Sequence, residues 1–468
     1  MPVPPPDVLP KVRRLALIGL DCGTPELLFE RFADDMPTLT KLREQALWGP
    51  LRSIDPPISI PAWICMLSGR TPGDLGVYGM RNRSDHSYKG MAFATSKTFG
   101  VPRLWELLGA AGLESIVLSV PGTYPPTPLQ GCMVSCFLTP STDVQFTYPP
   151  QLREEVQRVT GGYTIDIPGF RKDTEPVAQR MFDMTEQRFA LAKHLAATRT
   201  WDFLSFVDVA PDRLHHSFWK YCDPAHPKHE PGNRFVNVFR DYYRALDEHL
   251  ASFLEALPDD TAVLIASDHG GQPMIGGFRF NEWLSREGYL TLAERPSSPT
   301  ALGNAKVDWS RTTAWGEGGY YGRLFLNVEG REPNGTVPAA EYETVRQQLI
   351  DKLEALTDHE GRPMGTRALR PEEVYQTVNG IPPDLIVYFG NLRWRSVGSV
   401  GPDEGLYAFE NDTGPDDCNH SDQAVFVLAG EGLPTGRCDD LRIMDVAPTL
   451  QSLFGLPRQP GQVGRVRT

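Results

Sequence analysis

The sequence lacks the features that mark membrane-spanning proteins, disulfide frameworks and nucleic-acid binders. No run of about 18 apolar residues occurs in the 468-residue chain, so we expect no membrane span. Acidic residues outnumber basic ones, 59 to 46, and the formal charge of −13 argues against a nucleic-acid partner. Seven cysteines are few and odd in number for this length, which favours reduced thiols in a cytoplasmic protein.

Two common enzyme motifs are also missing. The sequence has no G-x-S-x-G, so it gives no support to a nucleophile elbow of the α/β-hydrolase kind. The stretch IGLDCG follows a predicted strand, but its spacing does not match the G-x-G-x-x-G of dinucleotide-binding enzymes. Both functions are therefore set aside.

The pattern of apolar segments predicts an α/β protein. Strand-like runs alternate with helical stretches such as 177–198 and 233–257, which indicates a mostly parallel sheet covered by helices on both faces. A further helix is expected over 24–46. The predicted strands lie at 13–21, 114–120, 201–209, 261–267, 323–328, 384–389 and 424–430.

One catalytic domain accounts for most of the chain. Residues 1–12 read as a Pro-rich N-terminal arm, and residues 13–468 as a single domain. The alternation breaks around 140–180 and 295–410, where Pro, Gly and aromatic residues are frequent. We interpret these two segments as insertions that cap the core.

Residues able to bind metal ions stand next to several predicted strands. Taken singly, each reads as a turn residue, a helix cap or a loop histidine. Together, three carboxylates and three imidazoles suit borderline divalent ions such as Zn²⁺ or Mn²⁺, and they suffice for two ions. The six residues are Asp21, Asp212, His216, Asp268, His269 and His420.

Ser59 is the candidate nucleophile. It lies in PPISIPAWICMLSG, where Pro61 marks a helix start and places the hydroxyl near the positive end of the helix dipole. A serine hydroxyl needs a base or a metal ion to lower its pKa, and the absent elbow motif leaves metal activation. The alternative is that Ser59 only caps the helix.

In its order of motifs, the chain resembles the alkaline phosphatase superfamily, and within it the type I phosphodiesterase/nucleotide pyrophosphatase-like family. The similarity runs from LIGLDCGTPELL to DVAPTLQSLFGLP, and the segment around Ser59 resembles the family's nucleophile helix. Many relatives carry Thr at that position. Relatives also usually have Gly in place of Cys22, to which we assign no catalytic role. The resemblance implies an alkaline-phosphatase-like core.

The resemblance further implies how the ligands divide between two ions. One ion would be bound by Asp21, Ser59, Asp268 and His269, and the other by Asp212, His216 and His420. His215 competes with His216, and the family spacing D-x-x-x-H selects His216. Zn²⁺ is the expected ion, with Mn²⁺ or Fe as alternatives. Attack by Ser59 would form a phosphoseryl intermediate that is then hydrolysed.

The expected substrate is a small phosphate ester, with nucleotides among the candidates. Arg323 and Arg395 lie in an aromatic-rich part of the insertion where they could grip a substrate or pack the cap against the core. Asn82 lies where nucleotide-cleaving relatives use an Asn near the phosphate. We expect a phosphodiesterase, with a homodimer left open. The alternatives are a phosphomonoesterase, sulfatase or phosphonate hydrolase, phosphoryl transfer within a substrate, and a non-catalytic relative.

Overall fold

The computed structural model describes residues 11–402, 404–409 and 415–467. Ten strands form the central sheet, in the order β24-β2-β23-β9-β1-β8-β5-β6-β7, with β25 beside β2. The edge strands β24 (Gly436–Arg437) and β25 (Leu441–Arg442) are two residues long. The main strands are β1 (Arg14–Leu20), β2 (Ala46–Arg52), β5 (Ser115–Leu118), β6 (Gly131–Val134), β8 (Phe203–Asp208), β9 (Thr261–Ala266) and β23 (Gln423–Ala429).

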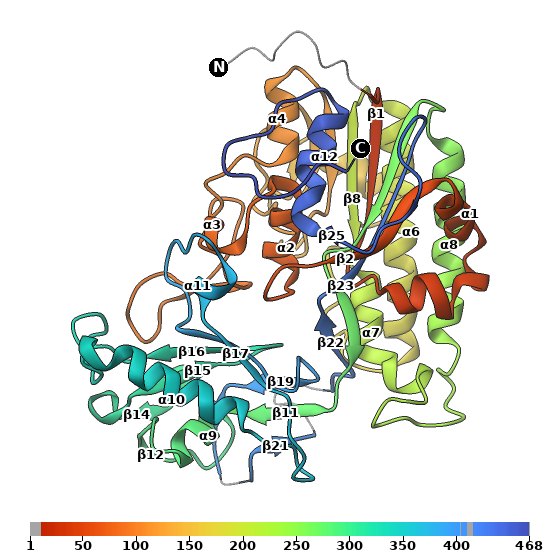
Figure 1. Cartoon of the computed structure of the whole chain (residues 1–468). Coiled ribbons are helices and arrows are strands. Elements are labelled where there is room, and N and C mark those ends of the chain that lie inside the picture. The colour runs from red at the N-terminus through yellow and green to blue at the C-terminus, as the bar shows by residue number, and fades with distance from the viewer. Residues whose placement is uncertain (1–10, 403, 410–414, 468) are drawn as a thin grey trace.

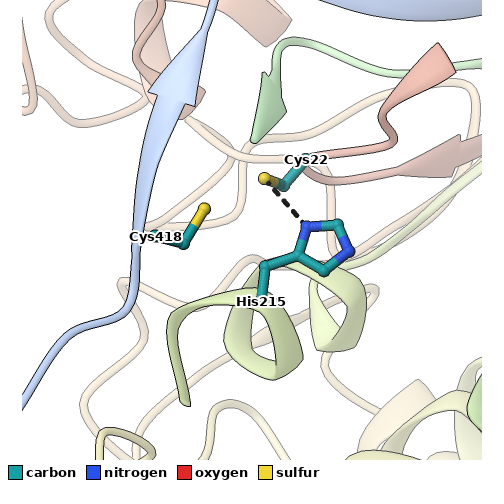
Figure 2. A group of neighbouring side chains, drawn as sticks. All are labelled: Cys22, His215 and Cys418. Carbon is teal, nitrogen blue, oxygen red and sulfur yellow. Dashed lines mark hydrogen bonds between the residues drawn. The ribbon is translucent and has the colours of Figure 1, made fainter. Parts of the chain in front are cut away.

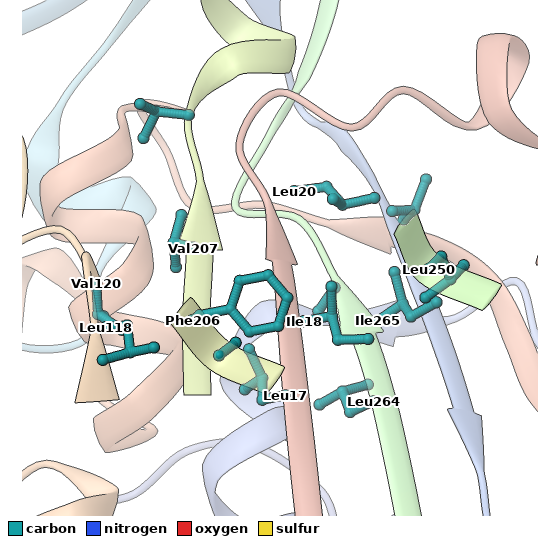
Figure 3. Close-up of a cluster of buried hydrophobic side chains, with 14 of the residues drawn as sticks. Leu17, Ile18, Leu20, Leu118, Val120, Phe206, Val207, Leu250, Leu264 and Ile265 are labelled. Atoms are coloured by element: carbon teal, nitrogen blue, oxygen red, sulfur yellow. The ribbon is translucent and has the colours of Figure 1, made fainter. Parts of the chain in front are cut away.

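The middle of this sheet is parallel and buried. β1 pairs in parallel with β8 on one side and with β9 on the other. Side chains such as Ile18, Phe206 and Ile265 are at most 1 % exposed, and they pack together in the core (Figure 3). A strand that is apolar at successive positions needs cover on both faces, which explains why RLALIGL does not alternate with polar residues.

Helices supply that cover (Figure 1). On one side lie α1 (Pro37–Glu44), α6 (Glu175–Thr198) and α8 (Val238–Ala256). On the other side lie α2 (Ser59–Ser68), α4 (Leu104–Ala110) and α12 (Val446–Leu453). α6 and α8 realise the helices predicted over 177–198 and 233–257, with α8 beginning five residues later than expected.

A smaller antiparallel sheet has a hydrophobic cluster of its own. It comprises β15 (Ala314–Glu317), β16 (Gly322–Leu326), β18 (Leu385–Tyr388) and β17 (Arg367–Leu369), with α10 (Tyr342–Glu354) beside it. The strands predicted at 323–328 and 384–389 therefore belong to this sheet and not to the central one. It falls within the 295–410 segment, whereas 140–180 holds β7 (Thr147–Tyr148), α5 (Leu152–Thr160) and the start of α6.

One local prediction was wrong, and one strand was not predicted. The helix expected over 24–46 is broken into a π-helical turn (Glu26–Arg31), a 3₁₀ turn and α1, because Pro37 starts a new helix. β2 was not predicted, since its sequence ALWGPLR contains Gly and Pro; it forms an antiparallel pair with β23.

Three further features concern the predicted setting of the chain. All seven cysteines are free thiols. In the part of the chain that the structure describes, no helix is long and apolar enough to cross a membrane. The predicted arm lies outside the described residues except for Lys11 and Val12, whose N–H groups donate to the carbonyl oxygen of Leu453.

Candidate active site

The first group of predicted ligands forms at the carboxyl ends of β1 and β9. Asp21 follows β1 and the pair Asp268-His269 follows β9. Because these strands are parallel neighbours, their carboxyl ends meet at one edge of the sheet. His269 Nε2 lies 3.6 Å from Asp21 Oδ1 and 3.2 Å from Asp268 Oδ2. All three side chains are buried with ligand atoms within 4.8 Å of one another.

The second group combines a helix and a short strand. Asp212 and His216 lie four residues apart on α7 (Ala210–Cys222), so they share a helix face. His420 lies on β22 (Cys418–Ser421). Asp212 Oδ1 is 3.3 Å from His216 Nε2 and 3.7 Å from His420 Nε2.

A short antiparallel pair joins the two groups. β10 (Gly270–Pro273) starts immediately after His269 and pairs with β22, where Gly271 lies opposite His420. The rings of His269 and His420 consequently stack, with centroids 3.7 Å apart. Gly270 is required here, because a Cβ at this position would lie 2.0 Å from the carbonyl oxygen of Gln423.

The histidines of both groups are oriented in the same way. His216 Nδ1 is 2.6 Å from Asp416 Oδ1, and His420 Nδ1 is 2.7 Å from the carbonyl oxygen of Pro57. His269 Nδ1 is 3.1 Å from the carbonyl oxygen of Gly270. Each Nδ1 can therefore donate a proton, which leaves Nε2 with a free lone pair as a metal ligand needs.

Ser59 lies between the first group and the start of α2. Its Oγ is 3.2 Å from His269 Nε2 and 3.4 Å from Asp21 Oδ1. Ser59 is the first residue of the helix, the N-cap is Ile58, and no side chain caps this end. The hydroxyl thus points at the predicted ligands, and capping does not explain it.

Trp63 fixes the distance between α2 and β1. Its Nε1 donates to Asp21 Oδ2 at 3.0 Å, so one indole connects the helix that carries Ser59 with the first carboxylate. The indole rests on Gly19, where a Cβ would lie only 2.5 Å from Trp63 Cη2. This contact was not foreseen from the sequence.

Charge is concentrated in this buried region. Burial, and then the charge of Asp212, raise the pKa of Asp21 to about 8. The pKa of Asp268 is also raised, by burial and by Asp21, while burial lowers the pKa of His269 to about 4. The positive charge near Asp21 and Asp268 is therefore too small to favour the ionised form of these two carboxyl groups.

Buried polar atoms without hydrogen-bond partners also indicate that this site binds cations. Four buried ligand atoms have no hydrogen-bond partner among the described residues, although buried polar atoms are normally paired. They are Asp212 Oδ1, His216 Nε2, Asp268 Oδ2 and His420 Nε2. Divalent cations would neutralise the carboxylates and use these lone pairs, so the residues fit the predicted metal ions.

Asp416, which was not predicted from the sequence, contacts the second group directly. Besides holding His216, its other oxygen lies 2.9 Å from Arg171 Nε and 3.7 Å from Arg395 Nη1. Tyr320, also not foreseen, places its ring 4.2 Å from that of His420. The only signal for Asp416 was its place shortly before the predicted ligand His420.

The three predicted substrate contacts differ in their surroundings. Arg395, on β19 (Trp394–Val397), reaches the second group through Asp416. Asn82 accepts from the N–H of Tyr78 at 2.7 Å and donates to the carbonyl oxygen of Gly79 at 2.8 Å. Arg323 Nη1 donates to the carbonyl oxygen of Arg81. Asn82 and Arg323 thus bond to the backbone of 78–81.

His215, the alternative to His216 as a metal ligand, makes its contacts outside the two groups of predicted ligands. Its Nε2 is 2.6 Å from the hydroxyl of Tyr243, and its Nδ1 is 3.3 Å from Cys22 Sγ. Neither nitrogen belongs to the groups formed by the predicted ligands.

Solved structures share this fold at low sequence identity. Human ectonucleotide pyrophosphatase/phosphodiesterase 5 is 12% identical with a TM-score of 0.57, and 96% of each chain is covered. An inactive murine counterpart in complex with AMP is 10% identical with a TM-score of 0.55, again with 96% of each chain covered. The predicted alkaline-phosphatase-like α/β core is confirmed.

A bacterial enzyme also shares the fold. Phosphonoacetate hydrolase from Sinorhizobium meliloti 1021, in complex with phosphonoformate, is 15% identical with a TM-score of 0.60, covering 95% of this chain and 96% of that one. Comparison with curated protein sequences gives no match.

The family model for type I phosphodiesterase / nucleotide pyrophosphatase matches residues 15–416. The match begins in β1 and ends at Asp416, so it includes both strand ends of the first group and α7. The chain therefore belongs to the type I phosphodiesterase/nucleotide pyrophosphatase family, whose members are hydrolytic enzymes.

Proposed function

We propose that the protein hydrolyses small phosphate diesters, with Ser59 as nucleophile and two divalent metal ions, expected to be Zn²⁺. The observation that carries this proposal is the position of Ser59 Oγ, buried at the first turn of α2 and within 3.4 Å of both Asp21 and His269. Asp21, Asp268 and His269, together with Ser59, would hold one ion, and Asp212, His216 and His420 the other.

The chemistry follows from these positions. Bound divalent ions would lower the pKa of the Ser59 hydroxyl and neutralise charge on the phosphoryl oxygens. Ser59 Oγ attacks phosphorus, and the hydroxyl proton passes to the first alcohol as it leaves, which gives a phosphoseryl ester that still carries the second organic group. At the start of α2, backbone N–H groups and the positive end of the helix dipole would favour binding of the phosphate next to Ser59. Water then cleaves the bond between Ser59 Oγ and phosphorus, which releases the phosphate monoester and restores the Ser59 hydroxyl.

A large neighbouring cavity favours a diester over a monoester. Its volume is about 710 Å³, and aromatic side chains and Asp166 line part of it. Asp166 forms an ion pair with Arg213, which in turn bonds to Asp212 of the second group. Two ion pairs thus connect the lining of the cavity to the second group, and the cavity would provide room for an organic group on the second ester oxygen. The aromatic lining residues are Phe93, Tyr124, Phe137 and Tyr163.

Hydrolysis of chromogenic esters by wild type and Ser59 variants tests the proposal. We expect bis-p-nitrophenyl phosphate to be the better substrate than p-nitrophenyl phosphate, sulfate and phosphonate esters. Ser59→Ala should lower kcat/KM for the diester by at least about 1,000-fold, while Asp21, Asp268 and His269 keep the first ion bound at saturating metal. Ser59→Thr, which keeps a hydroxyl, should retain activity.

Ser68→Ala, at the other end of α2, is the matched control and should behave as wild type. Full activity in Ser59→Ala would mean that water attacks directly and that Ser59 has no covalent role. A preference for a monoester, sulfate or phosphonate ester would keep the site and overturn the proposed substrate class.

The setting of the reaction belongs to the same proposal. We treat residues 13–468 as one catalytic domain, because both ligand groups draw on segments from Asp21 to His420. The free state of all seven cysteines supports a reducing compartment such as the cytoplasm.

A further inference from the structure

A third group of metal-competent side chains lies beside the two already described, and the proposed reaction does not use it. Cys22, His215 and Cys418 are all completely buried, and their sulfur and nitrogen atoms lie within 4.8 Å of one another (Figure 2). Cys22 Sγ and His215 Nδ1 are 3.3 Å apart. We propose that these residues form a third metal site, specific for a thiophilic divalent ion such as Zn²⁺.

The imidazole is oriented as a ligand would be. Its Nε2 lies 2.6 Å from the hydroxyl of Tyr243, a buried residue of α8, and this contact directs Nδ1 toward Cys22. Metal-binding histidines commonly fix their orientation through a hydrogen bond from the second ring nitrogen. His215 has this arrangement with its nitrogens exchanged relative to His216, His269 and His420.

Because Gly271 has no side chain, there is room for the sulfur atoms of both Cys22 and Cys418. A Cβ at Gly271 would lie 2.9 Å from Cys418 Sγ and 3.0 Å from Cys22 Sγ, so the two sulfurs flank the same bare Cα. Cys22 is also held at φ 64°, a left-handed conformation that costs a non-glycine residue on the order of 1 kcal/mol. The chain thus keeps a thiol where glycine would suit the backbone better.

The donor set selects the ion. Two thiolates and one imidazole match the ligands of Zn²⁺, whereas the neighbouring groups offer only carboxylates and imidazoles. Each thiol releases a proton to solvent as its metal–sulfur bond forms. Three protein ligands leave one tetrahedral position for a fourth ligand such as water. Cys22 also lies within 4.8 Å of ligand atoms of Asp212 and His269, so this site adjoins the two-metal site.

Cobalt titration of the full-length protein tests the third site without relying on catalysis. The protein is purified under reducing conditions, stripped of metal and titrated with Co²⁺ in the absence of oxygen. A thiolate ligand gives Co²⁺ an intense near-ultraviolet charge-transfer band, which carboxylates and imidazoles do not produce. We expect this band in the wild type, together with one Co²⁺ more than the two-metal site binds.

Two variants remove the thiols with little disturbance. Cys22→Gly suits the left-handed backbone, and Cys418→Ser keeps the size of the side chain. Both should lose the band and one equivalent of Co²⁺. Cys132→Ser, which changes a buried cysteine on β6, should keep both. If a variant does not fold, the wild-type band must appear together with the additional equivalent of Co²⁺, because Cys22 also lies within 4.8 Å of ligand atoms of Asp212 and His269 and a band alone does not distinguish the two arrangements.

Absence of the band in a wild type that binds two ions would overturn the inference. So would a Cys22–Cys418 disulfide in the purified protein, detected as two thiols that react only after reduction. A band without any ester hydrolysis would contradict the proposed function and leave the third site supported. Ester hydrolysis without the band would support the proposed function and overturn the third metal site.

Discussion

Single hydrogen bonds set the direction of the metal-binding nitrogens. His216 depends on the charged side chain of Asp416, whereas His269 and His420 depend on backbone carbonyl groups. A carboxylate can be removed by substitution and a carbonyl cannot. The second group is therefore where orientation of a ligand can be tested directly.

Asp416→Asn should weaken metal binding at the second group by about 10- to 100-fold. The variant keeps the shape of the side chain but loses the charge that faces His216 and Arg171. Calorimetric titration with Zn²⁺ measures the loss, and excess Zn²⁺ should restore hydrolysis. Asp417→Asn, which removes the adjacent carboxylate, is the control; equal weakening in both variants would contradict an orienting role for Asp416.

His226 links stability to pH. Its Nε2 donates to the carbonyl oxygen of Asp417 and its Nδ1 accepts from the N–H of Lys228, so the folded protein holds the neutral ring. Burial lowers its pKa from 6.5 to about 4, with Asp223 and two lysines as charged neighbours. Because the unfolded chain takes up this proton first, the stabilisation is complete above pH 6.5 and is lost as the pH falls toward 4.

His226→Gln should remove this pH-dependent part of the stability. The excess of the wild-type free energy of unfolding over that of the variant should shrink by on the order of 2 kcal/mol between pH 7 and pH 4.5. Urea denaturation at several pH values measures it. Parallel pH curves for the two proteins would show that His226 is not the responsible group.

At the scale of elements, the contact between α2 and β1 places the nucleophile. Trp63 lies over Gly19 and bonds to Asp21, so the packing distance between helix and strand also sets the distance between Ser59 and the first group. Val207 of β8 also limits the space at Gly19, because a Cβ at this position would lie 2.7 Å from the Val207 side chain. A small change in packing should therefore affect both stability and activity.

Gly19→Ala should destabilise the protein by about 1–3 kcal/mol and also lower kcat/KM. The added methyl group meets Trp63 Cη2 at 2.5 Å, in a core where neither neighbour can move freely. Urea denaturation and diester hydrolysis measure the two effects. Gly100→Ala, where a Cβ meets nothing within 4 Å, is the control. Loss of stability with unchanged kcat/KM would show that α2 does not control the position of Ser59.

At the scale of the whole molecule, bound metal ions should stabilise the folded protein. Asp21, Asp212 and Asp268 are each at most 2 % exposed and come from three separate segments. Ions bound among them would join these segments, and ligand binding stabilises the folded state by mass action. Metal content should therefore control thermal stability as well as activity.

Chelation should lower the melting temperature, and added Zn²⁺ should restore it. At free Zn²⁺ of 100 times Kd, each site contributes about 2.7 kcal/mol. Asp268→Asn should respond less to Zn²⁺, yet be more stable than wild type after chelation, because a buried carboxyl group with a raised pKa destabilises the metal-free protein at neutral pH. Differential scanning calorimetry with and without chelator measures both effects. An unchanged melting temperature in the wild type would argue against ions at this site.

The sequence by itself determined the alternating α/β architecture, and it was enough to predict a set of metal ligands. β1 and β9 are readable because a buried strand is continuously apolar, and Asp21, Asp268 and His269 are readable because they follow those strands directly. Since carboxyl ends of parallel strands meet at one edge, local order along the chain was enough to anticipate that such residues converge. The spacing of Asp212 and His216 is likewise a local property of a helix.

Only the tertiary structure decided which distant residues support that site. Asp416 is 200 positions from His216, Trp63 is 42 from Asp21, and His215 is 193 from Cys22, so no local period records these contacts. β2 is another example. Its Gly and Pro are not typical of a strand, and it forms a strand because it pairs with β23. Periodicity reports which face of an element is buried, whereas pairing and packing between distant segments decide what that face meets.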